Sequence, residues 1–119
     1  MITKDNADNI KARVVLEGAN GPTTLEADEI LNKNGVLVAP DILANAGGVC
    51  VSYLEWVQDL QRYFFTEEEV QEKTDKTMTR AFWEVVETMK KHSASMRDAA
   101  YIQAVGRVAE TLRALGRTK

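Results

Sequence analysis

Two short apolar runs with one capped helix between them constrain the fold of this chain more than any other feature. Residues 13–17 (RVVLE) and 36–39 (VLVA) are apolar and rich in β-branched residues, and turn-forming residues follow each run, a pattern typical of buried strands. The sequence TTLE, which begins at Thr23, has the form of a capping box and predicts a helix over residues 24–34. Gly35 then occupies the position of a left-handed helix C-cap. The order strand, helix, strand predicts a βαβ unit.

A right-handed βαβ unit places its two strands parallel in one sheet. Parallel strands are normally buried on both faces and flanked by further strands, whereas two strands alone leave two open edges. We therefore expect the chain to form part of a sheet whose remaining strands come from an upstream segment or from another chain. By itself, such a chain is expected to self-associate through its unpaired edges.

After the second strand the sequence predicts only helices. Apolar residues recur at helical spacing over residues 45–62, 67–91 and 95–116. The second of these segments starts at another capping box, which begins with Thr66, and the third starts at Ser95. The expected fold class is therefore α/β, with a βαβ unit of two parallel strands followed by three C-terminal helices.

The composition argues against several classes of function. The net charge of the 119 residues is −3, and acids and bases are interspersed, so the basic stripe that binds nucleic acid is absent from the sequence. One cysteine, Cys50, and one histidine, His92, make a metal site unpromising. No run approaches the roughly 20 apolar residues of a membrane span. We expect a cytoplasmic protein without nucleic-acid or membrane partners and without a bound metal.

Each of the two predicted strands is followed by a loop that carries an asparagine beside glycine. Residues 18–21 (GANG) follow the first strand, and residues 43–48 (LANAGG) follow the second. Because parallel strands end at the same edge of a sheet, Asn20 and Asn45 are expected to lie side by side there, where ligands bind in open α/β sheets. Two asparagines can hold a planar carboxamide or ribose hydroxyls. The alternative is a pair of Asn-Gly turns with no role beyond structure.

The helix after the second loop has a mixed face. If it already begins near Asn45, four residues share that face: Asn45, Gly48, Val49 and Ser52. An amide, a bare backbone and a hydroxyl suit a small polar ligand better than a core stripe. The alternative is that the two glycines only allow close packing of the helix. Asp41, at the end of the second strand, is more typical of a turn cap than of a catalytic acid.

Three ordered segments resemble signatures of the Glu/Leu/Phe/Val dehydrogenase family, and specifically of its glutamate dehydrogenases: residues 16–24 (LEGANGPTT), 40–49 (PDILANAGGV) and 52–58 (SYLEWVQ). The resemblance extends over about residues 10 to 116 and covers the C-terminal portion of such an enzyme. It implies a partial Rossmann-like, NAD-binding domain. Residues 1–62 would form the C-terminal half of the dinucleotide-binding domain, and residues 63–119 a helical segment that packs on it and toward a substrate domain.

The resemblance also implies roles for individual residues. Four match cofactor-binding positions near the nicotinamide and its ribose: Gly18, Ala19, Asn20 and Asn45. Three match positions that face the amino-acid substrate, with the serine at the distal carboxylate of glutamate: Gly48, Val49 and Ser52. No catalytic residue is expected in this chain, because the catalytic lysine and aspartate of the family belong to its N-terminal substrate domain.

The implied activity is the reversible oxidative deamination of L-glutamate to 2-oxoglutarate and ammonia, with NAD or NADP as cofactor. The full-length enzyme is expected to be a homo-hexamer, and this chain alone is expected to be inactive. Two alternatives stay open. One is a free-standing binding or assembly module. The other is part of a dehydrogenase for an apolar amino acid, although such relatives tend to have an apolar residue at the position of Ser52.

Overall fold

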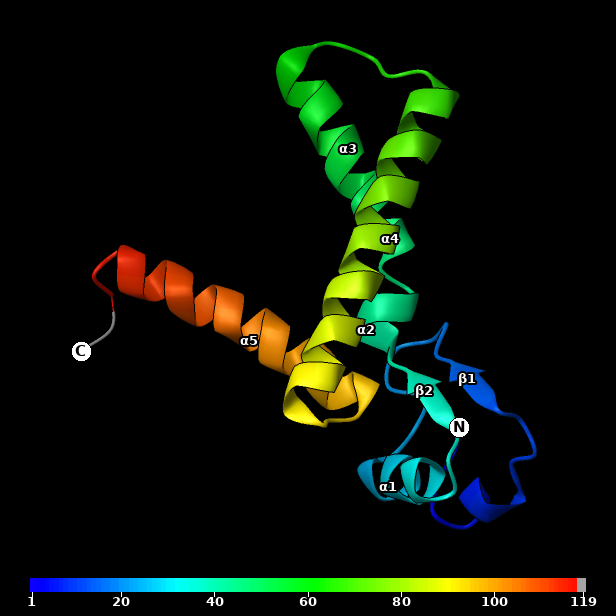
Figure 1. Ribbon diagram of the computed structural model, residues 1–119. Helices are drawn as coiled ribbons and strands as arrows, with labels where there is room; N and C mark the ends of the chain where they lie inside the picture. The colour runs from blue at the N-terminus through cyan, green and yellow to red at the C-terminus, as the bar shows by residue number, and fades with distance from the viewer. Residues whose placement is uncertain (118–119) are drawn as a thin grey trace.

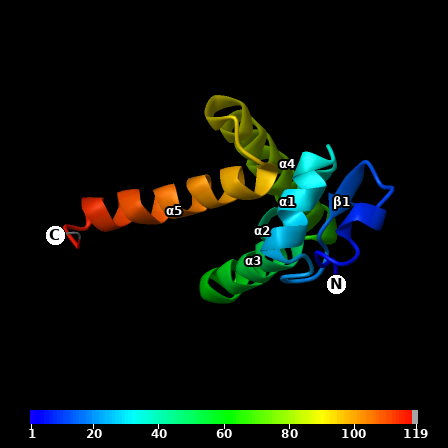
Figure 2. The same ribbon diagram turned by 90° about the horizontal axis from the view of Figure 1, so that it is seen from below.

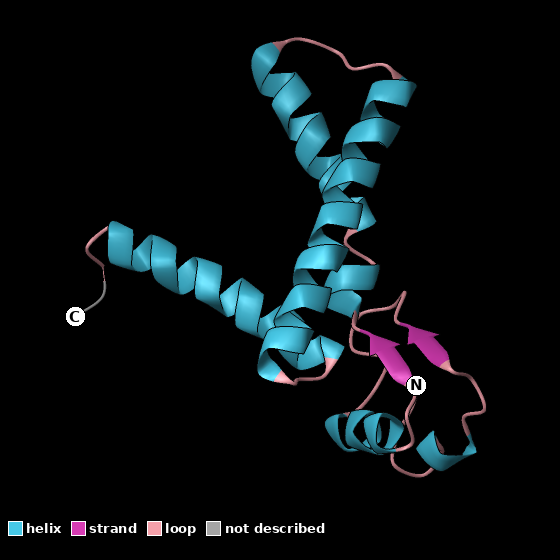
Figure 3. Cartoon of the chain, in the orientation of Figure 1, coloured by secondary structure: helices cyan, strands magenta, loops and turns pink. Residues whose placement is uncertain are grey.

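The computed structural model describes residues 1–117, and its elements follow the expected order of strand, helix, strand and further helices. They are η1 (Ala7–Asn9), β1 (Val14–Leu16), α1 (Leu25–Lys33), β2 (Leu37–Ala39), α2 (Asp41–Ala44), α3 (Gly47–Gln61), α4 (Glu67–His92) and α5 (Met96–Ala114). The sheet and α1 lie at one end of the molecule, and the three long helices diverge from it (Figure 1). Most of the described chain is helical (Figure 3).

The predicted βαβ unit is confirmed. Strands β1 and β2 pair in parallel, with Val15 opposite Val38. Helix α1 covers one face of this sheet, where Ala27 and Leu31 pack with Val36 and Val38 in one buried cluster. On β1, Leu16 keeps 72% of its surface exposed. Within residues 1–117 the sheet has only these two strands, so both of its edges are open, as the sequence predicts.

The N-terminal cap of α1 differs from the sequence-based expectation by one residue. Thr24, not Thr23, is the cap, and its Oγ1 accepts a hydrogen bond from the Ala27 amide at 3.3 Å. The reason is a contact with the first residues of the chain: Thr23 pairs with Ile2 in a parallel bridge. The Thr24 amide also donates to the Ile2 carbonyl oxygen at 3.0 Å, and Thr24 is extended, with ψ of 158°. Leu25, the first residue of α1, is 74% exposed and does not belong to the buried stripe of this helix. At the other end, Gly35 adopts the expected left-handed conformation, with φ of +75°.

The helix expected to begin near Asn45 is interrupted. A single turn, α2, ends at Asn45, whose amide donates to the Asp41 carbonyl oxygen at 3.0 Å. Helix α3 begins only at Gly47, with Ala46 as its N-cap. The side chain of Asn45 is bound by the loop after β1, and two glycines follow, which have low helix propensity. Asn45 therefore lies outside α3. The expectation that Asn45 shares one helical face with Gly48, Val49 and Ser52 is wrong for Asn45.

The starts of α4 and α5 are confirmed. Thr66 and Glu69 form a complete capping box at the start of α4. Ser95 caps α5 by accepting from the Asp98 amide at 3.1 Å. Where the two helices cross, Val85, Met96, Ala99 and Ala100 form a buried cluster with residues from the end of β2 and from α2. This cluster attaches the helical segment to the sheet.

Large parts of the helices are exposed. Helix α3 buries none of its residues fully, and α5 projects away from the other elements beyond its first turns (Figure 2). Several apolar side chains on these helices are more than half exposed: Tyr53, Trp56, Leu60, Val105 and Val108. No helix in the described range is both long enough and apolar enough to cross a membrane. The division into residues 1–62 and 63–119 stays an expectation.

Candidate functional site

The two asparagines predicted to be neighbours are in contact. Asn20 lies in the loop after β1, and Asn45 ends the single turn α2 after β2. The Nδ2 of Asn45 donates a hydrogen bond to the Oδ1 of Asn20 at 2.6 Å. The contact arises because both strands end at the same sheet edge and both loops are short.

A cleft of about 580 Å³ opens beside this pair, and seven residues line it: Gly18, Ala19, Asn20, Ile42, Asn45, Ala46 and Val49. All four residues predicted to bind a cofactor are among them. Of the three predicted to face a substrate, only Val49 lines the cleft. Gly48 and Ser52 lie on exposed positions of α3, so the structure brings the first group together and leaves these two outside its lining.

Asp41 holds both loops of the site. Its Oδ1 accepts from the Ile42 amide at 2.8 Å, which fits the expected role in the turn. Its Oδ2 accepts from the Gly21 amide, also at 2.8 Å, and thereby attaches the loop 18–21 to the start of α2. The Asp41 amide in turn donates to Oε2 of Glu17 at 2.8 Å. Asp41 therefore has a structural role at the site.

Arg97, in the first turn of α5, lies close to the carboxylates of Glu17, Asp28 and Asp41 and partly neutralises their charge. Its Nη2 lies 2.6 Å from Oε1 of Glu17 and 3.0 Å from Oδ1 of Asp28, and its Nη1 lies 3.9 Å from Oδ1 of Asp41. Burial opposes the charged form of Glu17, but hydrogen bonds from Arg97 and from the Asp41 amide outweigh it and lower the pKa of Glu17. Burial also opposes the charge of Arg97, but Glu17 and Asp28 raise the pKa of Arg97.

Sequence reasoning missed the roles of Glu17, Asp28 and Arg97. Two signals could have indicated them. Glu17 directly follows a strand that the sequence predicts to be buried, where a carboxylate needs a partner. Arg97 is a base in the first turn of a helix, where the macrodipole favours acids. Each charge is unfavourable in its local setting, and the ion pair between Arg97 and Glu17 compensates both.

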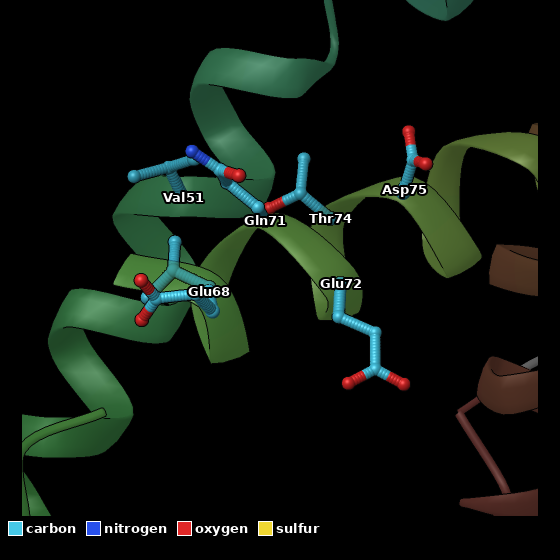
Figure 4. A pocket seen from close by; sticks show the side chains of 7 residues that line it. Val51, Glu68, Gln71, Glu72, Thr74 and Asp75 are labelled. Carbon is cyan, nitrogen blue, oxygen red and sulfur yellow. The ribbon is translucent and has the colours of Figure 1, made fainter. Parts of the chain in front are cut away.

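In a second large cleft the polar side chains do not converge on one position. Its volume is about 600 Å³, and it lies between α3 and the first turns of α4, lined by Val51, Glu68, Val70, Gln71, Glu72, Thr74 and Asp75. The carboxylates of Glu68, Glu72 and Asp75 spread apart and do not point to one position (Figure 4). Over residues 1–117 no group of three or more potential ligand residues could hold a metal ion.

A parallel βαβ unit with a cleft at the ends of its strands, followed by helices, defines a partial Rossmann-like α/β domain. The chain belongs to the Glutamate/Leucine/Phenylalanine/Valine dehydrogenase family, whose profile matches residues 1–116. The resemblance inferred from the sequence motifs is thus confirmed.

The chain is similar to several glutamate dehydrogenases. The chain is 59% identical over 104 residues to glutamate dehydrogenase of Thermotoga maritima, covering 87% of this chain and 25% of the relative. It is 48% identical over 115 residues to the NAD-specific glutamate dehydrogenase of Clostridioides difficile, covering 97% of this chain and 27% of the relative. The crystal structure of hetero-hexameric glutamate dehydrogenase from Thermus thermophilus matches with a TM-score of 0.91 at 36% identity, covering 97% of this chain and 28% of that one. The chain therefore spans about a quarter of the length of its curated relatives.

Proposed function

We propose that this chain supplies the nicotinamide side of the cleft in an NAD-dependent glutamate dehydrogenase. That enzyme converts L-glutamate reversibly into 2-oxoglutarate and ammonia. The observation that carries the proposal is the contact between Asn20 and Asn45 at the ends of two parallel strands. NAD is favoured over NADP because the relative from Clostridioides difficile is named as NAD-specific.

The asparagine pair fits the carboxamide and ribose of a nicotinamide nucleotide. The contact uses one N–H of Asn45 and the carbonyl oxygen of Asn20. This leaves the side-chain N–H groups of Asn20 as donors and the side-chain carbonyl oxygen of Asn45 as an acceptor. A carboxamide has one acceptor and one donor group and can therefore bind to both. Gly18 and Ala19 line the same cleft, and their small size allows a flat ring to approach the backbone. When bound, NAD would accept hydride from the substrate.

The substrate side of the proposal uses α3. Gly48, Val49 and Ser52 are exposed on this helix, and the hydroxyl of Ser52 can donate to the distal carboxylate of glutamate. An apolar amino acid would leave that hydroxyl without a partner, so glutamate is the preferred substrate class. No residue of this chain is proposed as the acid or base of the reaction.

We also propose that the protein works within a hexamer. The support is the relative from Thermus thermophilus, which is described as hetero-hexameric. Exposed apolar side chains on α3 and α5, such as Trp56 and Val105, provide surface that such an assembly could cover.

The binding role of the asparagines is tested by measuring NADH affinity with fluorescence in the protein expressed from its complete gene. Asn20→Ala and Asn45→Ala should each weaken binding about fivefold, since each removes a hydrogen-bonding group worth about 1 kcal/mol. Asn34→Ala, at the far end of α1, is the matched control and should bind NADH normally. Unchanged affinity in both site variants would refute the cofactor role.

Substrate choice is tested separately at Ser52. Ser52→Val should lower kcat/KM for glutamate strongly while leaving NADH affinity unchanged, because the serine is assigned to the substrate alone. A preferred substrate that does not change in this variant would favour an apolar amino acid instead.

A further inference from the structure

A continuous series of polar contacts joins helix α5 to the asparagine pair. Arg97 Nη2 donates to Oε1 of Glu17 at 2.6 Å, and Oε2 of Glu17 accepts from the Asp41 amide at 2.8 Å. Oδ2 of Asp41 then accepts from the Gly21 amide at 2.8 Å. Gly21 is the direct neighbour of Asn20. The series thus connects the first turn of the last helix with the loop that carries one half of the site.

Each carboxylate in the series is held at both of its oxygens. Glu17 uses one oxygen for Arg97 and the other for the Asp41 amide. Asp41 uses one for Gly21 and the other for Ile42. Neither carboxylate can therefore rotate without breaking a hydrogen bond. The side chains of Arg97 and Glu17 are 12% and 1% exposed, and charge-assisted bonds are strong and directional when water is excluded.

Asp41 is the residue through which the series reaches both asparagines. Through Gly21 its side chain fixes the loop that carries Asn20. Its carbonyl oxygen accepts from the Asn45 amide at 3.0 Å, so its backbone also fixes the end of the turn that carries Asn45. A shift of Asp41 would therefore change the separation of the two asparagine side chains.

Arg97 is suited to hold this arrangement because it faces three carboxylates at once. Glu17 and Asp28 share Nη2, and Asp41 lies 3.9 Å from Nη1. Without a cation these acids would repel each other in a poorly solvated space. The planar guanidinium reaches several acceptors in fixed directions, whereas the ammonium group of lysine is a single point charge.

We propose that Arg97 is a positioning residue for the site: through Glu17 and Asp41 it fixes the loop 18–21 and the contact between Asn20 and Asn45. The geometric part of this inference stands by itself. Its consequence for dinucleotide binding rests on the proposed function.

The test compares Arg97→Lys with the wild-type chain of 119 residues by NMR. In the variant, the Gly21 amide should exchange with solvent about tenfold faster, since a hydrogen bond to a charged group is weakened. The nuclear Overhauser contact between the side-chain amides of Asn20 and Asn45 should be lost. Slow exchange at Leu31, in the core under α1, should persist and show that the fold is retained. Arg107→Lys is the matched control, because Arg107 lies on the same helix but pairs with Glu84.

If Arg97→Lys fails to fold, the double variant Arg97→Met with Glu17→Met replaces it. Apolar residues of similar size often substitute for a buried ion pair without loss of stability. This variant also removes the acceptor for the Asp41 amide, so the same two changes are expected. A folded variant of either kind with unchanged Gly21 exchange and an intact asparagine contact would overturn the proposal.

A second measurement separates this inference from the proposed function. NADH affinity of the Arg97→Lys protein, expressed from its complete gene, should fall about tenfold, in parallel with loss of the asparagine contact. If the contact is lost and NADH affinity is unchanged, the positioning role is supported and the cofactor role of the asparagines is refuted. If affinity falls while the contact is intact, the positioning role is refuted.

Discussion

Removing the guanidinium of Arg97 should destabilise the fold more than removing any exposed base. In Arg97→Met the side chain of Glu17, which is 1% exposed, loses its only cationic partner in the described part of the chain. Breaking a buried ion pair by deleting one partner costs about 3–5 kcal/mol, because the remaining charge is left without compensation. Arg107→Met is the control: Arg107 and Glu84 are 63% and 35% exposed, and an exposed pair contributes about 0.2–1 kcal/mol.

The assay is urea unfolding at neutral pH, followed by circular dichroism. For an m-value of about 2 kcal/mol per molar urea, typical of small proteins, a loss of about 4 kcal/mol lowers the midpoint by about 2 M. Adding Glu17→Met to Arg97→Met should recover most of this loss, since no buried charge then faces the vacated position. A loss below about 1 kcal/mol in Arg97→Met would mean that the buried pair contributes no more than an exposed one, and the reasoning would be refuted.

Three further predictions concern pH, a helix cap and a glycine. Burial raises the pKa of Glu17, but hydrogen bonds from Arg97 and from the Asp41 amide outweigh it and keep this pKa below its ordinary value of 4.5. Glu17 therefore contributes stability above pH 4.5 that is lost as the pH falls through the lowered pKa. Urea midpoints measured across this acidic range should vary less in Glu17→Gln than in the wild type; an equally steep dependence would contradict the assignment. Thr66→Ala removes one half of the capping box of α4 and should cost about 1 kcal/mol in the free energy of unfolding, whereas Thr77→Ala on the same helix lacks any capping role and serves as the control. Gly35→Ala should cost about 1–2 kcal/mol in the same assay, because φ is +75° and no atom lies within 4 Å of the added Cβ, so that backbone strain alone is measured; an unchanged midpoint would show that the turn relaxes.

The sequence predicts those parts of the fold that depend on neighbouring residues. The two strands, the capping box at Thr66 and the left-handed Gly35 all follow from local patterns. The contact between Asn20 and Asn45 also follows, because parallel strands end at one edge and short loops cannot carry their residues far from it. The cofactor and substrate roles of these loops stay predictions.

What the sequence could not supply are the contacts between distant segments. The start of α1 moved by one residue because Ile2 pairs with Thr23. The interruption before α3 coincides with the hydrogen bond from Asn45 to a loop 25 residues earlier. The pairing of Arg97 with Glu17 spans 80 residues, and nothing in either local pattern specifies the other partner.

That long span has a consequence for the order in which the chain acquires its structure. Contacts between residues close in sequence form early, because closing a short loop costs less entropy than closing a long one. Within residues 1–117 we therefore expect the βαβ unit to form before Glu17 and Arg97 meet, both in refolding and during synthesis. Glu17 stays a solvated carboxylate until Arg97 has been synthesised and α5 has docked. We expect the asparagine pair to acquire its final geometry only in this last step, after the βαβ unit has formed.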